Sequence, residues 1–247
     1  FEPSTAGDPK LLGALNPGQL KTSKPSWLVG LDYRVSDSLL VYFNHRGSWR
    51  TGGVNGTSGA QFPDPDPFKP ETTYDFEVGA KFSGFVGNVK AQFNLAVYDQ
   101  YIRNVQRSVY INNAANAGNA NKARVTGAEL DADIAFSSHF SIGGALTYTN
   151  ARFTDGRATV AGQNFVFGPY ADAPKYSGSF FAKASTGIGE AGTVSLRGEI
   201  YAQSKFFYSN LNDTVLPNTV IGGYKLVNLR AEWSEIFGSQ VSAAAFV

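Results

Sequence analysis

Residues 70–82 have the sequence PETTYDFEVGAKF, and from Thr73 onwards two kinds of side chain alternate. One set is polar or small, and the other is apolar: Tyr74, Phe76, Val78, Ala80 and Phe82. A period of two predicts a β-strand with one wet face and one apolar face. Ten or more residues exceed the usual soluble strand of about five or six and are enough to cross a bilayer at a tilt. The stretch therefore predicts one strand of a transmembrane barrel.

Composition narrows the class of protein. The 247 residues carry a formal charge of +1 and no Cys, which argues against a nucleic-acid partner and excludes disulfides and thiolate metal sites. The sequence contains no run of eighteen apolar residues, so no membrane helix is predicted. Barrel strands need no such run, because their apolar residues alternate with polar ones. Because the chain has no Met and begins with Phe1, we expect it to be processed or a fragment.

The same alternation recurs in about ten segments. The predicted strands are 27–35, 39–47, 73–82, 89–100, 125–136, 140–149, 176–185, 194–203, 225–233 and 240–247. Their connections alternate between short and long, which is typical of outer-membrane barrels and not required in a soluble sandwich. One long connection contains the Asn/Ala-biased tract 112–121, which we expect to be unable to pack a core.

Five motifs in order along the chain carry a family resemblance. They are Arg46–Asn55, Pro70–Lys81, Gly127–Leu130, Ala173–Gly178 and Gly223–Arg230. Together they resemble strand motifs of TonB-dependent outer-membrane receptors. The resemblance implies an all-β, antiparallel transmembrane barrel of 22 strands around an N-terminal plug. It also implies import of a scarce nutrient, such as a ferric siderophore, vitamin B12 or an oligosaccharide, with energy passed through TonB.

Compared with that pattern, the chain is expected to be partial. Residues 1–26 are predicted to be a loop entering from upstream barrel, and 27–247 about strands 12 to 21, without the plug, TonB-contacting segment and final strand. An open sheet in hydrocarbon would leave two unpaired edges at a cost of roughly tens of kcal/mol, so the rest of the barrel is expected in another chain or lost by cleavage. The implied surroundings are the bacterial outer membrane, its lipid and lipopolysaccharide, the rest of the receptor, TonB and a nutrient ligand.

Charged residues on the polar face of the predicted strands are candidates for lining the lumen. They could guide a ligand, seat a plug or simply solvate the interior, since a charge facing lipid costs about 2–4 kcal/mol at the midplane. The candidates are Glu77, Lys81, Glu129, Asp131, Asp133, Arg197, Glu199, Arg230 and Glu232, together with Asp75.

Aromatic and basic residues of the long connections are candidates for contacting the nutrient. The alternatives are a membrane-interface girdle or loop packing for the aromatics, and lipopolysaccharide phosphate or water for the arginines. The candidates are Trp49, Arg50, Arg103, Arg107, Tyr110, Phe165, Phe167, Tyr170, Phe207 and Tyr208.

Other classes of function are less well supported by the sequence. The only histidines, His45 and His139, lack a nucleophile motif, so no catalytic residue, cofactor or metal site is predicted. The run Pro63–Pro67 could hold calcium but lacks spaced ligands, which favours a rigid linker. A passive pore and a soluble adhesin-like sheet remain the alternatives to a TonB-coupled receptor.

Overall fold

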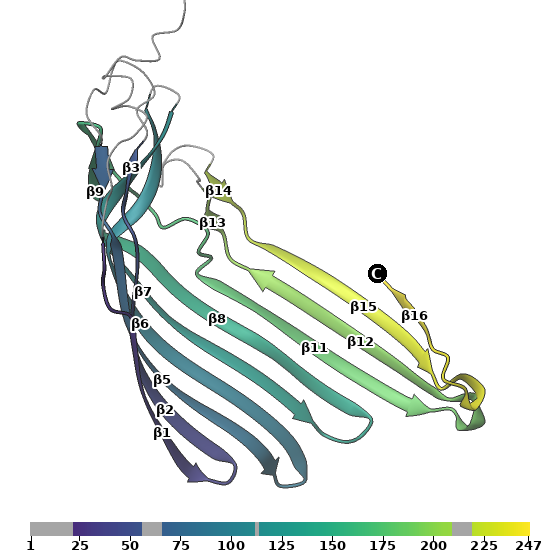
Figure 1. Ribbon diagram of the computed structural model, residues 1–247. Helices are drawn as coiled ribbons and strands as arrows, with labels where there is room; N and C mark the ends of the chain where they lie inside the picture. The colour runs from purple at the N-terminus through teal and green to yellow at the C-terminus, as the bar shows by residue number, and fades with distance from the viewer. Residues whose placement is uncertain (1–21, 56–65, 112–113, 209–218) are drawn as a thin grey trace, which may run out of the picture.

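The computed structural model describes residues 22–55, 66–111, 114–208 and 219–247. Ten strands form one curved antiparallel sheet in sequence order (Figure 1). They are β1 (Trp27–Ser36), β2 (Leu39–Arg50), β5 (Glu71–Val86), β6 (Val89–Ile111), β7 (Ala114–Ala135), β8 (Phe140–Asp155), β11 (Tyr176–Gly187), β12 (Thr193–Gln203), β15 (Tyr224–Ser234) and β16 (Ala243–Phe246). The ten predicted transmembrane strands are thereby confirmed.

Short turns close one end of the sheet. The β5–β6 turn places Gly87 in the left-handed region, with φ of 63°, where glycine has no steric penalty. Single 3-10 turns, η1 (Gly189–Ala191) and η2 (Ile236–Gly238), complete the last two connections at this end. Figure 1 shows these turns together, opposite the long connections. This layout is the one expected of an outer-membrane barrel.

The strand register puts apolar side chains of neighbouring strands on one face. Val78 pairs with Phe43 and Val97, and Leu130 pairs with Leu95 and Leu146. No second sheet covers this face in the described residues, and Phe76 and Val227 are 43% and 64% exposed. A two-layer soluble sandwich would have buried them, so the apolar face is the lipid face of a transmembrane barrel.

The long connections are more ordered than their composition predicts. Three form two-stranded ribbons: β3 (Gly53–Asn55) with β4 (Asp66–Phe68), β9 (Arg157–Val160) with β10 (Gln163–Val166), and β13 (Phe206–Phe207) with β14 (Val220–Ile221). The predicted entering loop, 1–26, and the predicted proline-rich linker, 63–67, lie mainly outside the described residues. Only 22–26 of the loop and 66–67 of the linker are described, and Pro67 belongs to β4.

The Asn/Ala tract is the clearest correction. Residues 114–121 were expected to be an unpacked connection, but they continue β7 and pair with β6 up to Ile111. Ala120 is completely buried, and a Cβ at Gly118 would lie 2.1 Å from Val160 Cγ2. Small side chains here allow a neighbouring strand to approach, so low hydrophobicity reflects close packing. Residues 112 and 113 lie outside the described chain.

The sheet is open in the described residues. Strand β1 pairs only with β2, and β16 pairs only with β15, so each leaves one edge without a partner strand. Among the described residues, no helix is long and apolar enough to cross a membrane.

Candidate ligand-binding site

The β6–β7 ribbon turns over where it leaves the rest of the sheet. Asn104 has φ of 54°, in the left-handed region that Asn tolerates better than most residues. Ile102 and Val105 are three residues apart, and in a regular strand that spacing would place their side chains on opposite faces. Both side chains nevertheless lie in the same buried cluster. Beyond Asn104, the alternation of faces is therefore offset by one residue.

Amide side chains fix β3–β4 against this ribbon. Asn55 Nδ2 donates to the Ala117 carbonyl, and the Ala117 N–H donates to Asn55 Oδ1, both over 2.7 Å. Asn119 does the same for Lys69, accepting from its N–H over 2.6 Å and donating to its carbonyl over 2.9 Å. Gln106 Nε2 also donates to the Lys69 carbonyl, over 3.0 Å. These side chains satisfy edge groups that no strand pairs with.

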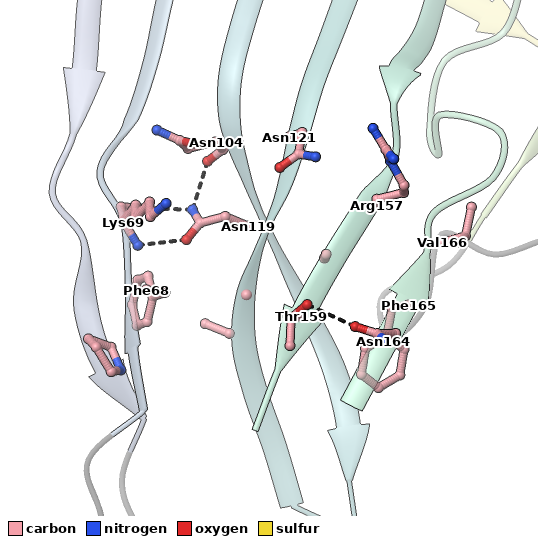
Figure 2. A pocket seen from close by; sticks show the side chains of 14 residues that line it. Phe68, Lys69, Asn104, Asn119, Asn121, Arg157, Thr159, Asn164, Phe165 and Val166 are labelled. Carbon is pink, nitrogen blue, oxygen red and sulfur yellow. Dashed lines mark hydrogen bonds between the residues drawn. The ribbon is translucent and has the colours of Figure 1, made fainter. Parts of the chain in front are cut away.

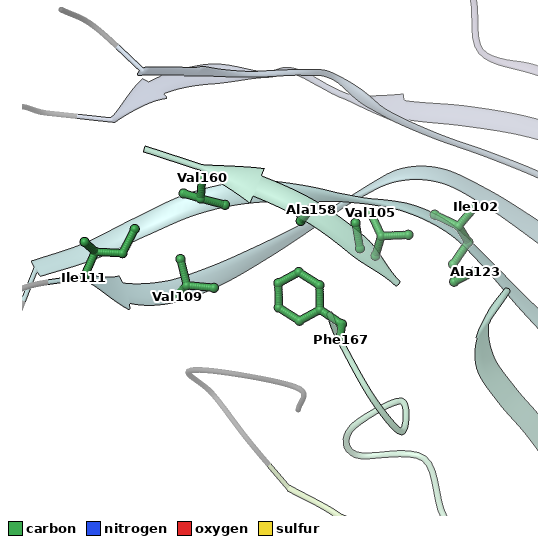
Figure 3. Close-up of a cluster of buried hydrophobic side chains, with 9 residues drawn as sticks. Ile102, Val105, Val109, Ile111, Ala123, Ala158, Val160 and Phe167 are labelled. Carbon is green, nitrogen blue, oxygen red and sulfur yellow. The ribbon is translucent and has the colours of Figure 1, made fainter. Parts of the chain in front are cut away.

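A buried hydrophobic cluster holds the β9–β10 ribbon to β6–β7. Val109 and Val160 are 0% and 1% exposed, and the Phe167 ring, 3% exposed, points into the cluster (Figure 3). The remaining buried members are Ile102, Val105, Ile111, Ala120, Ala123 and Ala158. This is the largest dry core of the described chain, and it gives the outer elements a rigid base.

A cavity of about 740 Å³ lies across the outer part of β7. Figure 2 shows Phe68 and Lys69 on one side of β7, and Arg157, Thr159 and Phe165 on the other. The cavity is also lined by Pro67, Asn104, Ala117, Gly118, Asn119, Asn121, Ala158, Asn164 and Val166. Its volume is in the range of small-molecule sites, and its wall combines two cations, four amides and two aromatic rings.

Hydrogen bonds orient the polar wall of this cavity. Thr159 Oγ1 donates to Asn164 Oδ1 over 2.9 Å, and Asn121 Nδ2 donates to Asp155 Oδ2 over 3.0 Å. Arg157 donates from Nε and Nη2 to the two oxygens of Asp155, over 2.9 and 2.8 Å, and this hydrogen bonding raises the pKa of the guanidinium above its ordinary value. The Arg157 guanidinium is therefore held in place by Asp155, which also balances its charge, and Lys69 lies across β7 from it.

Three of the predicted contact residues meet around the ring of Phe153. The Arg107 guanidinium lies 4.7 Å from the ring centroid of Tyr170 and 5.5 Å from that of Phe153. The Phe153 ring contacts both Tyr170 and Phe167, with centroids 5.2 and 5.8 Å apart. Phe167 is buried in the core, so packing accounts for it, whereas Arg107 and Tyr170 are only partly buried. Sequence reasoning had not included Phe153.

The other predicted contact residues are spread around the outer elements. Trp49 and Arg103 both lie opposite Thr72 in the sheet, on the lipid face, and Arg50 forms an ion pair with Glu71 over 2.9 Å. Phe165 lines the cavity. Tyr110 and Tyr208 are exposed, and Phe207 belongs to β13. Arg103, Arg107 and Tyr110 were expected in a connection, but they lie within β6.

All nine predicted lumen-lining residues share the face opposite the lipid face. Asn44 pairs with Glu77, and Arg197 pairs with Arg230. Arg46 binds Asp75 and Glu77 over 2.9 and 2.7 Å, which makes a cross-strand ion network. Two further ion pairs join residues within one strand, Arg197–Glu199 and Arg230–Glu232. The remaining predicted residues on this face are Lys81, Glu129, Asp131 and Asp133.

Several cavity residues were missed by the sequence reasoning. Lys69, Asn119 and Arg157 come from three different connections and carry no common motif. Lys69 follows Phe68 in the sequence, and Arg152 precedes Phe153. A basic or aromatic residue in a long connection is the signal that selected the other candidates. Their convergence depends on the register of β6–β7, which composition does not show.

An open-ended antiparallel sheet with one lipid face, one charged face and ordered outer ribbons defines a segment of an outer-membrane β-barrel. A protein-family model described as TonB dependent receptor-like, beta-barrel matches residues 4–246. The chain belongs to this family, so the resemblance is confirmed, together with the bacterial outer membrane as its location. The family consists of receptors and transporters, not enzymes.

Solved structures share the fold. The ferric yersiniabactin uptake receptor FyuA from Yersinia pestis has a TM-score of 0.62 and 19% identity, over 83% of this chain and 29% of that one. BauA, the ferric preacinetobactin receptor from Acinetobacter baumannii, has a TM-score of 0.60 and 22% identity, over 85% and 29% of the two chains. The chain thus spans less than a third of the length of these two proteins. None of the curated proteins compared with it matches.

Proposed function

We propose that residues 27–247 form about strands 12 to 21 of a receptor barrel that captures a scarce nutrient and imports it with energy from TonB. The observation that carries the proposal is the cavity across β7, held by a dry core on one side and amide pairs on the other. A rigid polar cavity above a charged lumen suits capture followed by passage. The rest of the barrel and the plug would close the edges at β1 and β16.

The cavity wall favours an anionic, oxygen-rich nutrient. Lys69 supplies a positive charge, and Arg157 supplies a guanidinium that Asp155 orients. The amides of Asn121 and Asn164 supply further hydrogen bonds, and Phe165 supplies an apolar surface. No carboxylate lines the cavity among the described residues. A ferric siderophore has this chemistry. One similar structure is named as a siderophore receptor, and two others as receptors for ferric yersiniabactin and ferric preacinetobactin. Arg107 and Tyr170, whose guanidinium and ring are 4.7 Å apart, are proposed as further ligand contacts.

Direct binding to the full-length receptor tests the cavity. Lys69→Gln and Phe165→Ala should each weaken binding of the cognate ferric siderophore about tenfold or more, because charge-assisted hydrogen bonds and buried rings are worth about 1.5–3 kcal/mol. Lys205→Gln removes an exposed lysine outside the cavity and should leave the Kd unchanged. Deleting residues 158–169, which include Phe165, would be a poorer test of ligand binding. The deletion also removes Ala158, Val160 and Phe167 from the hydrophobic core, so a loss of binding could reflect a loss of structure. Wild-type Kd values in both cavity variants would contradict the assignment.

Uptake experiments separate a TonB-coupled receptor from a passive pore. Cells producing the full-length receptor should lose uptake of the labelled nutrient when TonB is deleted, while surface binding persists. The purified receptor should show little single-channel conductance, because a plug would fill the lumen. Equal uptake with and without TonB, or steady ohmic conductance, would favour the pore.

A further inference from the structure

Two charged side chains, and not a neighbouring strand, attach the outer part of β6 to the barrel. β6 pairs with β5 only as far as Arg103, opposite Thr72, so the backbone groups of Gln106 on that side need other partners. The Gln106 N–H donates to Glu71 Oε2 over 2.7 Å, and its carbonyl accepts from Arg50 Nη2 over 3.1 Å. Arg50 also donates to the same Glu71 oxygen, over 2.9 Å. One ion pair therefore offers this strand both an acceptor and a donor.

The side chain of Gln106 extends the contact to the ligand cavity. Its Nε2 donates to the carbonyls of Thr51 and Lys69, over 2.8 and 3.0 Å. Asn119, which is paired with Gln106 in the β6–β7 ladder, bonds both the N–H and the carbonyl of Lys69. Figure 2 shows Asn119 bonded to Lys69 and to Asn104. Two side chains of a single rung therefore fix the backbone of Lys69.

The ion pair lies outside the cavity that this rung serves. Of the described residues in the network, Lys69 and Asn119 line the cavity, whereas Arg50, Glu71 and Gln106 do not. The Glu71 side chain is 19% exposed, and the part-buried Gln106 N–H would lose this acceptor if the carboxylate were removed. Any effect of Glu71 on a ligand in the cavity must therefore pass through Gln106 and Lys69.

We infer that Arg50 and Glu71 are positioning residues for the ligand cavity, because they hold Gln106 and, through it, the cation of Lys69. The inference rests on the proposed function, in which Lys69 meets an anionic nutrient. A loosened rung would leave Lys69 to be ordered at the moment of binding, and ordering one such side chain weakens affinity about twofold to tenfold. Arg50, which the sequence suggested as a direct contact, thus acts on the nutrient indirectly.

A double-mutant cycle on the purified full-length receptor tests this route. The probe is whichever of a ferric tricatecholate, a ferric trihydroxamate and ferric citrate binds the wild type most tightly. Glu71→Ala should weaken binding of the probe about fivefold. In the Lys69→Gln background the same substitution should change the Kd by less than about twofold, because the side chain that it positions is gone. A general loosening of the cavity would weaken binding in both backgrounds.

Two further variants separate position from charge and from folding. Glu71→Gln keeps an oxygen that can accept from the Gln106 N–H, so its Kd should stay within about twofold of wild type. Glu232→Ala is the matched control, since it removes an Arg–Glu pair of the same lumenal face near the short turns, and it should leave the Kd unchanged. Heat-modifiable migration checks that each variant is folded.

Hydrogen exchange on the wild-type receptor decides the matter even if Glu71→Ala does not fold. The Gln106 amide should exchange at least about tenfold more slowly than in an unstructured peptide, although no strand of β5 pairs with it. An unprotected Gln106 amide, or an equal loss of affinity from Glu71→Ala in both backgrounds, would overturn the positioning role. Wild-type affinity in Lys69→Gln, or no binding of any of the three probes, would instead refute the proposed cavity, and the inference with it.

Discussion

Replacing Asn55 by Ala should loosen the outer part of β7 without disturbing the barrel. Beyond Lys122, β7 has no ladder partner on the β8 side in the described residues, and the Asn55 amide takes the place of one by bonding both backbone groups of Ala117. The substitution leaves a part-buried N–H and a part-buried carbonyl without these partners, each costing about 1–3 kcal/mol. Partial access of water places the sum near the lower limit, at about 2 kcal/mol.

Hydrogen exchange on the full-length receptor measures this loss where it occurs. A local cost of about 2 kcal/mol corresponds to about thirtyfold faster exchange of the Ala117 amide. Exchange of the membrane part of β7, around Leu130, should not change. Asn228→Ala, an exposed residue on the lumenal face, is the matched control and should have no effect. Unchanged exchange at Ala117, or uniformly faster exchange along the whole of β7, would refute the role given to Asn55.

Three other substitutions test the core and the membrane face. Phe167→Ala should destabilise the β9–β10 ribbon by about 3 kcal/mol or more, seen as faster amide exchange in both strands. Gly118→Val should cost about 1–3 kcal/mol through overpacking against Val160, and Val160→Ala in the same chain should recover most of it in urea unfolding. Val97→Arg, near the middle of the lipid face, should cost about 2–4 kcal/mol in refolding assays, whereas the lumenal Asn94→Arg should stay within about 0.5 kcal/mol of wild type.

The membrane part of the fold was predictable because the bilayer imposes a simple rule on the sequence. Lipid accepts no charge on one face, so Phe76, Val97 and Leu130 alternate with polar residues, and the period alone gives both strand and face. Glu77 and Arg197 could be assigned to the lumenal side for the same reason. The lipid-facing side chains could be predicted without knowledge of side-chain packing, because they contact fluid hydrocarbon and not another part of the protein.

The outer elements escaped prediction because contacts, not lipid, determine them. Val105, Val109 and Ile111 do alternate, but their partner strand consists of Ala, Asn and Gly, which hydropathy does not distinguish from a loop. The cavity is built from connections that meet only once β6 and β7 pair beyond Asn104. Residue type suggested Arg107 and Phe165, whereas Lys69 and Asn119 required the three-dimensional arrangement.

The left-handed backbone at Asn104 has a consequence for how this receptor can vary. Below it, an insertion of one residue would exchange oil-facing and water-facing side chains along the whole strand, so length can change only in twos. Above it, the direction in which each side chain points is determined by the elements that pack against the β6–β7 ribbon. Asn104 thus separates a membrane-spanning strand, whose length is fixed by the bilayer, from an outer ribbon whose length and sequence can change to suit a new ligand.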